Sequence, residues 1–276
     1  MSSGEIKKPR LSHQDVEFLV HTAAAEVTDK VNLKRVLEED ADFRNRFVSD
    51  EKVFRAVADD DQVLLKISAA LYFEILLRRA ARDLSATSYT LEKTLTMIIP
   101  VFDTDDLVAL LAEESLLVYL SEMLSSFTRV ESYAVTFRVK KGVWRKIRFN
   151  DLDIRSLMSF CEIVDDAYRF ALYKRIADIC LFMLGVFPEY TSRNSRYPLS
   201  GKLRPASGMN PRITPEDYEK EGRRFYKLAA EHSAARELNM EDVFWALHEN
   251  FQKLKKPLSF ITEHYLQYKR QMIFAN

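Results

Sequence analysis

Glycine is scarce in this chain: six of the 276 residues are glycine. Average usage of about 7% would give about 19. Glycine supplies the positive-φ conformations that tight turns and phosphate-binding loops require. A turn-rich β-sandwich, a β-barrel or an enzyme with a glycine-rich phosphate loop is therefore disfavoured. Apolar residues make up 47% of the chain, which is too much for a mostly disordered protein.

Apolar residues recur at helical spacing through most of the chain. The sequence therefore predicts an all-α fold, a bundle of about nine or ten helices with one β-hairpin insertion. A late helix is expected to stop before Pro257, because proline interrupts helical hydrogen bonding, and Ser259 would cap the final helix. The longest predicted helices cover residues 62–84, 90–99, 104–127 and 153–187.

Two predicted helix starts carry the pattern of a capping box, in which a side chain at each end bonds the backbone of the other. Ser12 is followed by Asp15, and Thr214 is followed by Asp217. Pro215 then occupies the first helical position, where its missing N–H costs nothing. These signals predict helices that begin next to residues 12 and 214.

Residues 133–149 break the helical pattern. Apolar side chains alternate with others along the first half of this segment, which is typical of a strand. Residues 140–142, ending in Gly142, are suited to a turn, so the segment is predicted to form one β-hairpin. The expected cross-strand pairs are Val139 with Val143, Val135 with Ile147, and Tyr133 with Phe149.

The change of pattern near residue 131 also suggests how the chain is divided. Four parts are expected: a disordered N-terminus at 1–10, an N-terminal helical lobe at 11–130, the hairpin at 131–150, and a C-terminal helical lobe at 151–276. The last lobe includes a basic loop at 189–215 that is rich in proline, serine and arginine. A segment of this length without periodicity is usually functional or disordered.

Cysteine content and hydropathy point to a soluble cytoplasmic protein. Cys161 and Cys180 fall on one predicted helix, which would separate them by about 28 Å, too far for a disulfide. The longest uncharged run is ten residues, from Ile179 to Pro188, half of what a bilayer requires. No membrane partner is expected.

The chain carries no motif for catalysis, metal binding or a cofactor. His232, His248 and His264 fall on three different predicted helices without metal-ligand spacing. Acidic clusters such as residues 59–61 precede helices, where they stabilise the positive end of the helix dipole. The sequence has no GxSxG elbow, Walker loop or GxGxxG turn. We therefore assign no catalytic residue, no metal and no cofactor.

Several charged residues interrupt apolar helix faces and need a partner, because an unpaired buried charge is costly. One interpretation is an internal network of arginines and acids that ties helices together. The other is an arginine-lined pocket for a phosphate or carboxylate, which the guanidinium group binds well. The residues concerned are Arg78, Arg79, Arg82, Arg175 and Asp178.

Charge is balanced overall but unevenly placed. Residues 1–130 hold 16 basic and 23 acidic side chains, a net −7, whereas residues 131–276 hold 25 and 18, a net +7. The surplus lies in segments 131–150 and 189–215, where aromatic residues are interleaved with cations, as in sites for nucleic-acid backbones. The candidate contacts are Arg138, Lys140, Lys141, Trp144, Lys146 and Arg148 in the hairpin, and Arg193, Arg196, Lys202, Arg204 and Arg212 in the loop.

These observations predict a non-enzymatic binding or regulatory module that engages an anionic protein or nucleic acid through the hairpin and the loop. The alternative is an all-α enzyme or small-ligand sensor built around the arginine pocket. The neutral total charge lacks the basic excess of dedicated nucleic-acid binders. The two oppositely charged halves would also allow copies of the chain to associate as a homo-oligomer.

Overall fold

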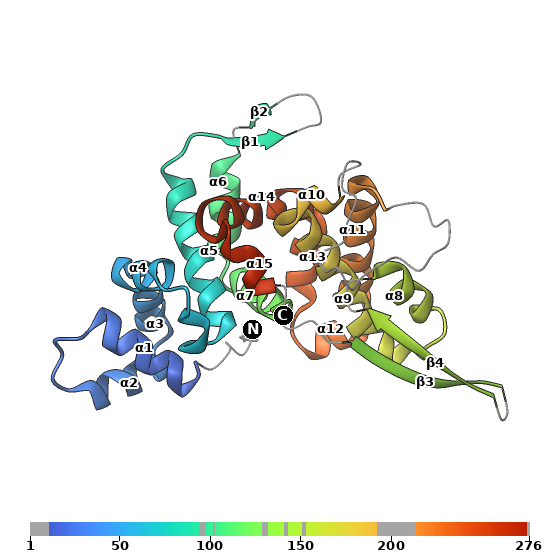
Figure 1. Ribbon diagram of the computed structural model, residues 1–276, viewed down its shortest axis with the longest axis horizontal. Helices are drawn as coiled ribbons and strands as arrows, with labels where there is room; N and C mark the ends of the chain where they lie inside the picture. The colour runs from blue at the N-terminus through green and yellow to red at the C-terminus, as the bar shows by residue number, and fades with distance from the viewer. Residues whose placement is uncertain are drawn as a thin grey trace. The chain divides into compact units, whose positions relative to one another are not determined.

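The computed structural model describes residues 11–93, 98–101, 103–128, 132–140, 143–150, 153–191 and 213–274. The described part is predominantly helical, which confirms the predicted class (Figure 1). It contains 15 α-helices, more than the nine or ten expected, because short breaks divide several of the long predicted helices.

The chain forms two compact units. The first comprises residues 1–126 together with 256–272, and the second comprises residues 127–255 together with 273–276. Each unit is therefore assembled from two separate stretches of the sequence.

The first unit has a core of packed helices in which α5 is central. Helix α5 packs against α6 and α7, and its Leu71, Phe73 and Leu77 are buried. Its helices are α1 (His13–Ala23), α2 (Lys30–Glu39), α3 (Ala41–Val48), α4 (Glu51–Asp59), the 3₁₀-helix η1 (Val63–Leu65), α5 (Ala69–Ser85), α6 (Thr104–Ala112) and α7 (Glu114–Ser126). From the C-terminal stretch it includes the π-helix η2 (Thr262–Leu266) and most of α15 (Lys269–Phe274).

The buried carboxylate of Asp15 ties two helix starts together. Asp15 accepts a hydrogen bond from the backbone N–H of Ser12 at 2.9 Å and forms the capping box of α1. Its other oxygen accepts from the N–H of Ser68 at 2.7 Å. Ser68 in turn caps α5, because its Oγ accepts from the N–H of Leu71. The predicted helix at 62–84 therefore begins at residue 69, one residue after a cap that the apolar spacing concealed.

The helix predicted at 90–99 is wrong. Strands β1 (Thr90–Lys93) and β2 (Ile98–Val101) pair there in antiparallel fashion, with Leu91 opposite Pro100. The β2 segment contains three β-branched residues and a proline, which lose more in a helix than in a strand. A window this short does not distinguish helical from strand periodicity.

The second unit is built around α9, whose second half is buried on all sides from Ile176 to Val186. Helix α11 packs along α9 and also against α13. The elements of this unit are β3 (Ser132–Lys140), β4 (Val143–Asn150), α8 (Ile154–Cys161), α9 (Asp166–Val186), α10 (Pro188–Thr191), α11 (Pro215–Glu231), α12 (Ser233–Glu237) and α13 (Glu241–Glu249); α14 (Phe251–Ile261) begins in it and ends in the first unit.

Close packing of α11 on its neighbours depends on Gly222. A Cβ atom at this position would lie 2.4 Å from Cζ of Phe251 and 2.8 Å from Cβ of Cys180. The absence of a side chain thus lets α11 approach both α9 and α14. The two cysteines lie on different helices, α8 and α9, and both are free thiols, so the single-helix argument about their separation was wrong.

Strands β3 and β4 form an antiparallel pair. Tyr133 lies opposite Phe149 and Val135 opposite Ile147 in the register. The register shifts between Arg138 and Lys140, so that Lys140, rather than Val139, pairs with Val143. A bulge of this kind places one extra residue in one strand.

Two of the predicted helix boundaries are displaced. The helix expected at 153–187 is interrupted between α8 and α9, where Asp165 occupies the N-cap position. Helix α14 continues through Pro257 instead of stopping before it, and Ser259 lies inside the helix rather than at a cap. Leu254 and Leu258 on this helix are fully buried, and their burial outweighs the helical hydrogen bond that Pro257 removes.

Candidate anion-binding site

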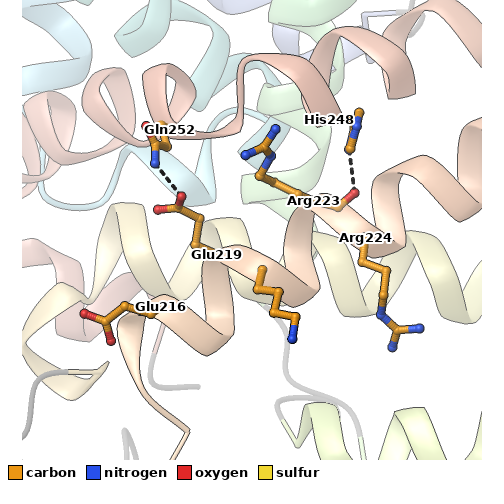
Figure 2. A pocket seen from close by; sticks show the side chains of 7 residues that line it. Glu216, Glu219, Arg223, Arg224, His248 and Gln252 are labelled. Carbon is orange, nitrogen blue, oxygen red and sulfur yellow. Dashed lines mark hydrogen bonds between the residues drawn. The ribbon is translucent and has the colours of Figure 1, made fainter.

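A shallow, open depression lies on the surface of the second unit, where α11 meets α13 and α14 (Figure 2). Its volume is about 570 Å³. Seven polar side chains line it: Glu216, Glu219, Lys220, Arg223, Arg224, His248 and Gln252. Three of these are permanent cations and two are carboxylates, which leaves a net charge of +1.

Two of the cations have no salt-bridge partner in the described part of the chain. Lys220 and Arg223 are exposed on α11, and no described carboxylate lies within 4.0 Å of either. Arg224 differs, because its Nε lies 2.7 Å from a carboxylate oxygen of Glu221. Lys220 and Arg223 can therefore meet an external anion without first giving up an internal partner.

Glu219 is held by its own partners on α14. It accepts a hydrogen bond from Gln252 and another from Lys255, the latter at 3.0 Å. Burial alone raises the pKa of Glu219, but the hydrogen bonds from Gln252 and Lys255 outweigh it, and the net pKa is lowered. Glu219 therefore stays ionised at neutral pH and is already neutralised by Lys255.

His248 is oriented by the backbone of the facing helix. Its Nδ1 lies 2.8 Å from the carbonyl oxygen of Arg223, so Nδ1 carries the proton and donates to that carbonyl (Figure 2). The ring also meets Trp245 edge to face, with centroids 5.7 Å apart. These contacts fix the imidazole beside the Arg223 backbone.

The lowered pKa of Glu219 gives a testable pH dependence. Its ionised form stabilises the fold above the pKa of the unfolded chain, and this contribution disappears as pH falls through the folded-state pKa. Glu219→Gln is expected to lower the free energy of unfolding by about 1 kcal/mol or less at pH 7, since the pair is partly exposed. Urea denaturation should show this difference shrinking as the pH falls below the ordinary pKa of glutamate and through the lowered pKa of Glu219; a difference that does not shrink on acidification would contradict the assignment.

The arginines predicted on α5 are engaged in an internal network in the first unit. Arg78 bonds Glu74 through Nε and Glu114 through Nη2, both at distances of 3.0 Å or less. Arg79 pairs with Glu51 and, through Nε, with Asp83 at 2.8 Å. Both side chains are therefore paired with acids of their own unit, although Nε of Arg79 makes no hydrogen bond within the described part of the chain.

Glu74 is the centre of this network; the sequence places it beside the arginines of the same helix but gives no sign of its partner Arg44. The carboxylate is buried and accepts two hydrogen bonds from Arg44, at 2.9 and 2.6 Å, in addition to those from Arg78. Arg82, in contrast, is 66% exposed and lies 3.7 Å from Glu51. Arg82 is thus the least engaged arginine on α5.

The other two predicted residues, Arg175 and Asp178, lie on α9 in the second unit. Asp178 is fully buried and accepts hydrogen bonds from the hydroxyl of Tyr226 at 2.9 Å and from Lys174 at 2.7 Å. The guanidinium of Arg175 stacks over the ring of Phe127, 4.0 Å from its centroid. These contacts join α9 to its neighbours within the core.

The structure describes only some of the contact residues predicted in the two basic segments. The backbone positions of Arg138, Lys140, Trp144, Lys146 and Arg148 belong to β3 and β4, and Arg138 lies opposite Trp144 in the register. Lys141 lies outside the described residues. The same holds for the loop contacts Arg193, Arg196, Lys202, Arg204 and Arg212.

Sequence reasoning missed Lys220 and Arg223, although a signal was present. Four cations recur on α11 with helical spacing: Lys220, Arg223, Arg224 and Lys227. Residues three and four apart are neighbours on a helix surface, so this spacing concentrates positive charge on one face. What the pattern could not reveal is which cations have an acidic partner.

Two further findings concern all the described residues. Within these ranges, no three histidine, cysteine or acidic side chains are grouped so that they could hold a metal ion. Among the helices that are described, none has the length and apolar content to cross a bilayer.

Comparison of the chain with protein-family models, with curated proteins and with solved structures found no match.

Proposed function

We propose that the chain is a non-enzymatic binding or regulatory module that engages an anionic protein or nucleic acid. The observation that carries this proposal is the pair of exposed cations in the depression on α11, Lys220 and Arg223, neither of which has a described carboxylate within 4.0 Å.

The position of the other basic segments supports the same proposal. The hairpin at 131–150 and the loop at 189–215, which carry most of the surplus positive charge, belong to the same unit as the depression. We propose that all three contribute to recognition of the partner. The depression itself is open and shallow, a shape that suits an extended partner better than an enclosed small ligand.

The free thiols of Cys161 and Cys180 favour a reducing compartment. We therefore propose that the partner is met in the cytoplasm.

Charge reversal on α11 tests the proposal directly. Lys220→Glu combined with Arg223→Glu is expected to weaken binding at least tenfold at low salt, because two attractive contacts become repulsive. The measurement is fluorescence anisotropy with a labelled 20-nucleotide single strand, a 20-base-pair duplex and a polyglutamate peptide. In a nucleic-acid complex, each lost phosphate contact should also reduce the slope of log affinity against log salt by about 0.7–0.9.

A matched control separates the site from total charge. Arg46→Glu combined with Lys52→Glu makes the same charge change on exposed residues of the first unit, and should leave affinity within about twofold. If none of the three probes binds at low salt, the proposal is wrong. Equal losses in the two double variants would show that only net charge matters, and would remove Lys220 and Arg223 as a site.

A further inference from the structure

A second, smaller depression lies in the first unit, between α5, α6 and α7. Its volume is about 280 Å³. Unlike the depression on α11, it combines an apolar surface with two arginines. The apolar lining is formed by Ala81, Val108, Leu111, Ala112 and Leu117, and the polar lining by Ser49, Arg78, Arg82 and Ser85.

Arg78 retains donors that the internal network does not use. Its Nε and Nη2 are bonded to Glu74, Asn45 and Glu114. Its Nη1 makes no hydrogen bond to any described residue, and the side chain is 13% exposed. The network therefore fixes this guanidinium in place while leaving one nitrogen, with two N–H groups, available to a ligand.

Arg82 provides the second donor group. Glu51, its closest carboxylate among the described residues, is 3.7 Å from Nη1, which is too long for a hydrogen bond. Glu51 is shared with Arg55 and Arg79, which bind it at shorter range. Arg82 thus has a largely uncompensated positive charge at the edge of the depression.

The local charge balance indicates what kind of anion fits. Arg44, Arg78 and Arg79 are matched by Glu74, Glu114 and Asp83, whereas Arg82 shares Glu51 with two other arginines. These arginines, together with Arg55, outnumber the four carboxylates by one. The net charge beside the depression is therefore about +1, which suits a monoanion rather than a phosphate dianion. The accessible apolar surface of Ala81, Val108 and Ala112 would be covered by an apolar group next to the anion, with Leu111 and Leu117 buried beneath it.

We infer that this depression binds a carboxylate that carries a short branched apolar group. The carboxylate would accept hydrogen bonds from Arg78 Nη1 and from Arg82, and the apolar group would lie on α6 and α7. Such a carboxylate occurs in free branched-chain acids and at the C-terminus of a peptide that ends in leucine. This inference is independent of the proposed function, because it concerns a different unit and a different ligand chemistry.

Methyl-labelled protein allows the site to be tested by NMR titration. N-acetyl-leucine is expected to shift the methyl signals of Val108, Leu111 and Leu117, with a dissociation constant of about a millimolar for a ligand of this size. Its amide, which lacks the charge, should bind at least tenfold more weakly. Binding by 4-methylpentanoate equal to that of Ala-Ala-Leu would identify a free acid as the ligand; tighter binding of the peptide would identify a C-terminus.

Three variants make the test specific. Arg82→Gln should weaken N-acetyl-leucine about tenfold, and Ala112→Phe should abolish binding by filling the depression from an exposed helix position. Arg35→Gln is the matched control: Arg35 pairs with Glu39 outside this network and does not line the depression, so affinity should not change. Equal binding of acid and amide, full affinity in Arg82→Gln, or no methyl shift at 20 mM ligand would overturn the inference, where 20 mM is about twenty times the expected constant.

Discussion

Replacement of Glu74 by leucine is expected to lower the free energy of unfolding by about 3–5 kcal/mol, the cost of leaving a buried charge without its partner. Glu74 is 3% exposed and accepts hydrogen bonds from both Arg44 and Arg78. Without this carboxylate, the buried guanidinium of Arg44 would keep one carboxylate, Glu114 at 4.0 Å, and a hydrogen bond to Asn45 at 3.3 Å. Urea denaturation followed by circular dichroism measures the loss.

Two comparisons show whether the cost comes from the network. Glu39→Gln removes an exposed partner of Arg35, and should cost no more than about 0.5 kcal/mol. The double variant Arg44→Met, Glu74→Leu should be less destabilised than the sum of its single variants, because it leaves no unpaired charge from that pair. Strict additivity would contradict the proposed role of Glu74 as the centre of the network.

The second large effect is expected at Gly222, where alanine should destabilise the protein by about 1–3 kcal/mol. In an ordinary helix interior, the same change stabilises by about 0.5–1 kcal/mol, because alanine loses less backbone entropy than glycine. Here the new Cβ would lie 2.4 Å from one ring atom of Phe251 and 2.5 Å from another. Overpacking therefore reverses the sign that helix propensity alone predicts.

A change in Phe251 checks this explanation. Phe251→Leu should destabilise the natural protein, because Phe251 is fully buried. In the Gly222→Ala background, the same change should restore stability by relieving the overlap. Lys227→Ala, on the exposed side of α11, should change the free energy of unfolding by less than about 0.5 kcal/mol. A stabilised Gly222→Ala protein would show that α11 can move away from α14 without cost.

Helix starts were predictable from sequence because their signals lie within one turn of chain. The capping boxes at Ser12 and Thr214 are both confirmed, with hydrogen bonds from the backbone of Asp15 and Asp217 to the cap oxygens. The general helical class followed from the same local periodicity. Neither prediction required knowledge of distant residues.

The interruptions between helices were harder to predict than the helix starts, because apolar spacing alone does not reveal them. Pro257 looked like a stop, yet α14 continues through it with Leu254 and Leu258 buried on the same helix. The segment at 90–101 had helical spacing, yet it pairs as β1 and β2. Burial decides the first case, whereas in the second the β-branched residues and proline of β2 favour a strand that apolar spacing alone did not indicate.

The candidate sites show the same contrast between local patterns, which the sequence reveals, and contacts between distant residues, which it does not. The sequence required the apolar-face arginines to be paired or to line a pocket, and Arg78 takes part in both: a bonded network and an open depression. That its partner is Glu114, 36 residues away, could not be read from spacing. The cations of α11 were visible as a helical pattern, but which of them have a carboxylate within salt-bridge distance depends on the fold.

The first unit is assembled from two separate stretches of the sequence, and this affects how it can fold during synthesis. Tyr265 donates a hydrogen bond to Asp83, Lys256 pairs with Asp103, and Lys269 binds the carbonyl of Ala58. A ribosome synthesises residues 127–255 before it reaches these three side chains. The N-terminal helices therefore lack their contacts with residues 256–272 until almost the whole second unit has been synthesised. Exposure of apolar surface during translation is then a consequence of this chain's connectivity rather than of its stability.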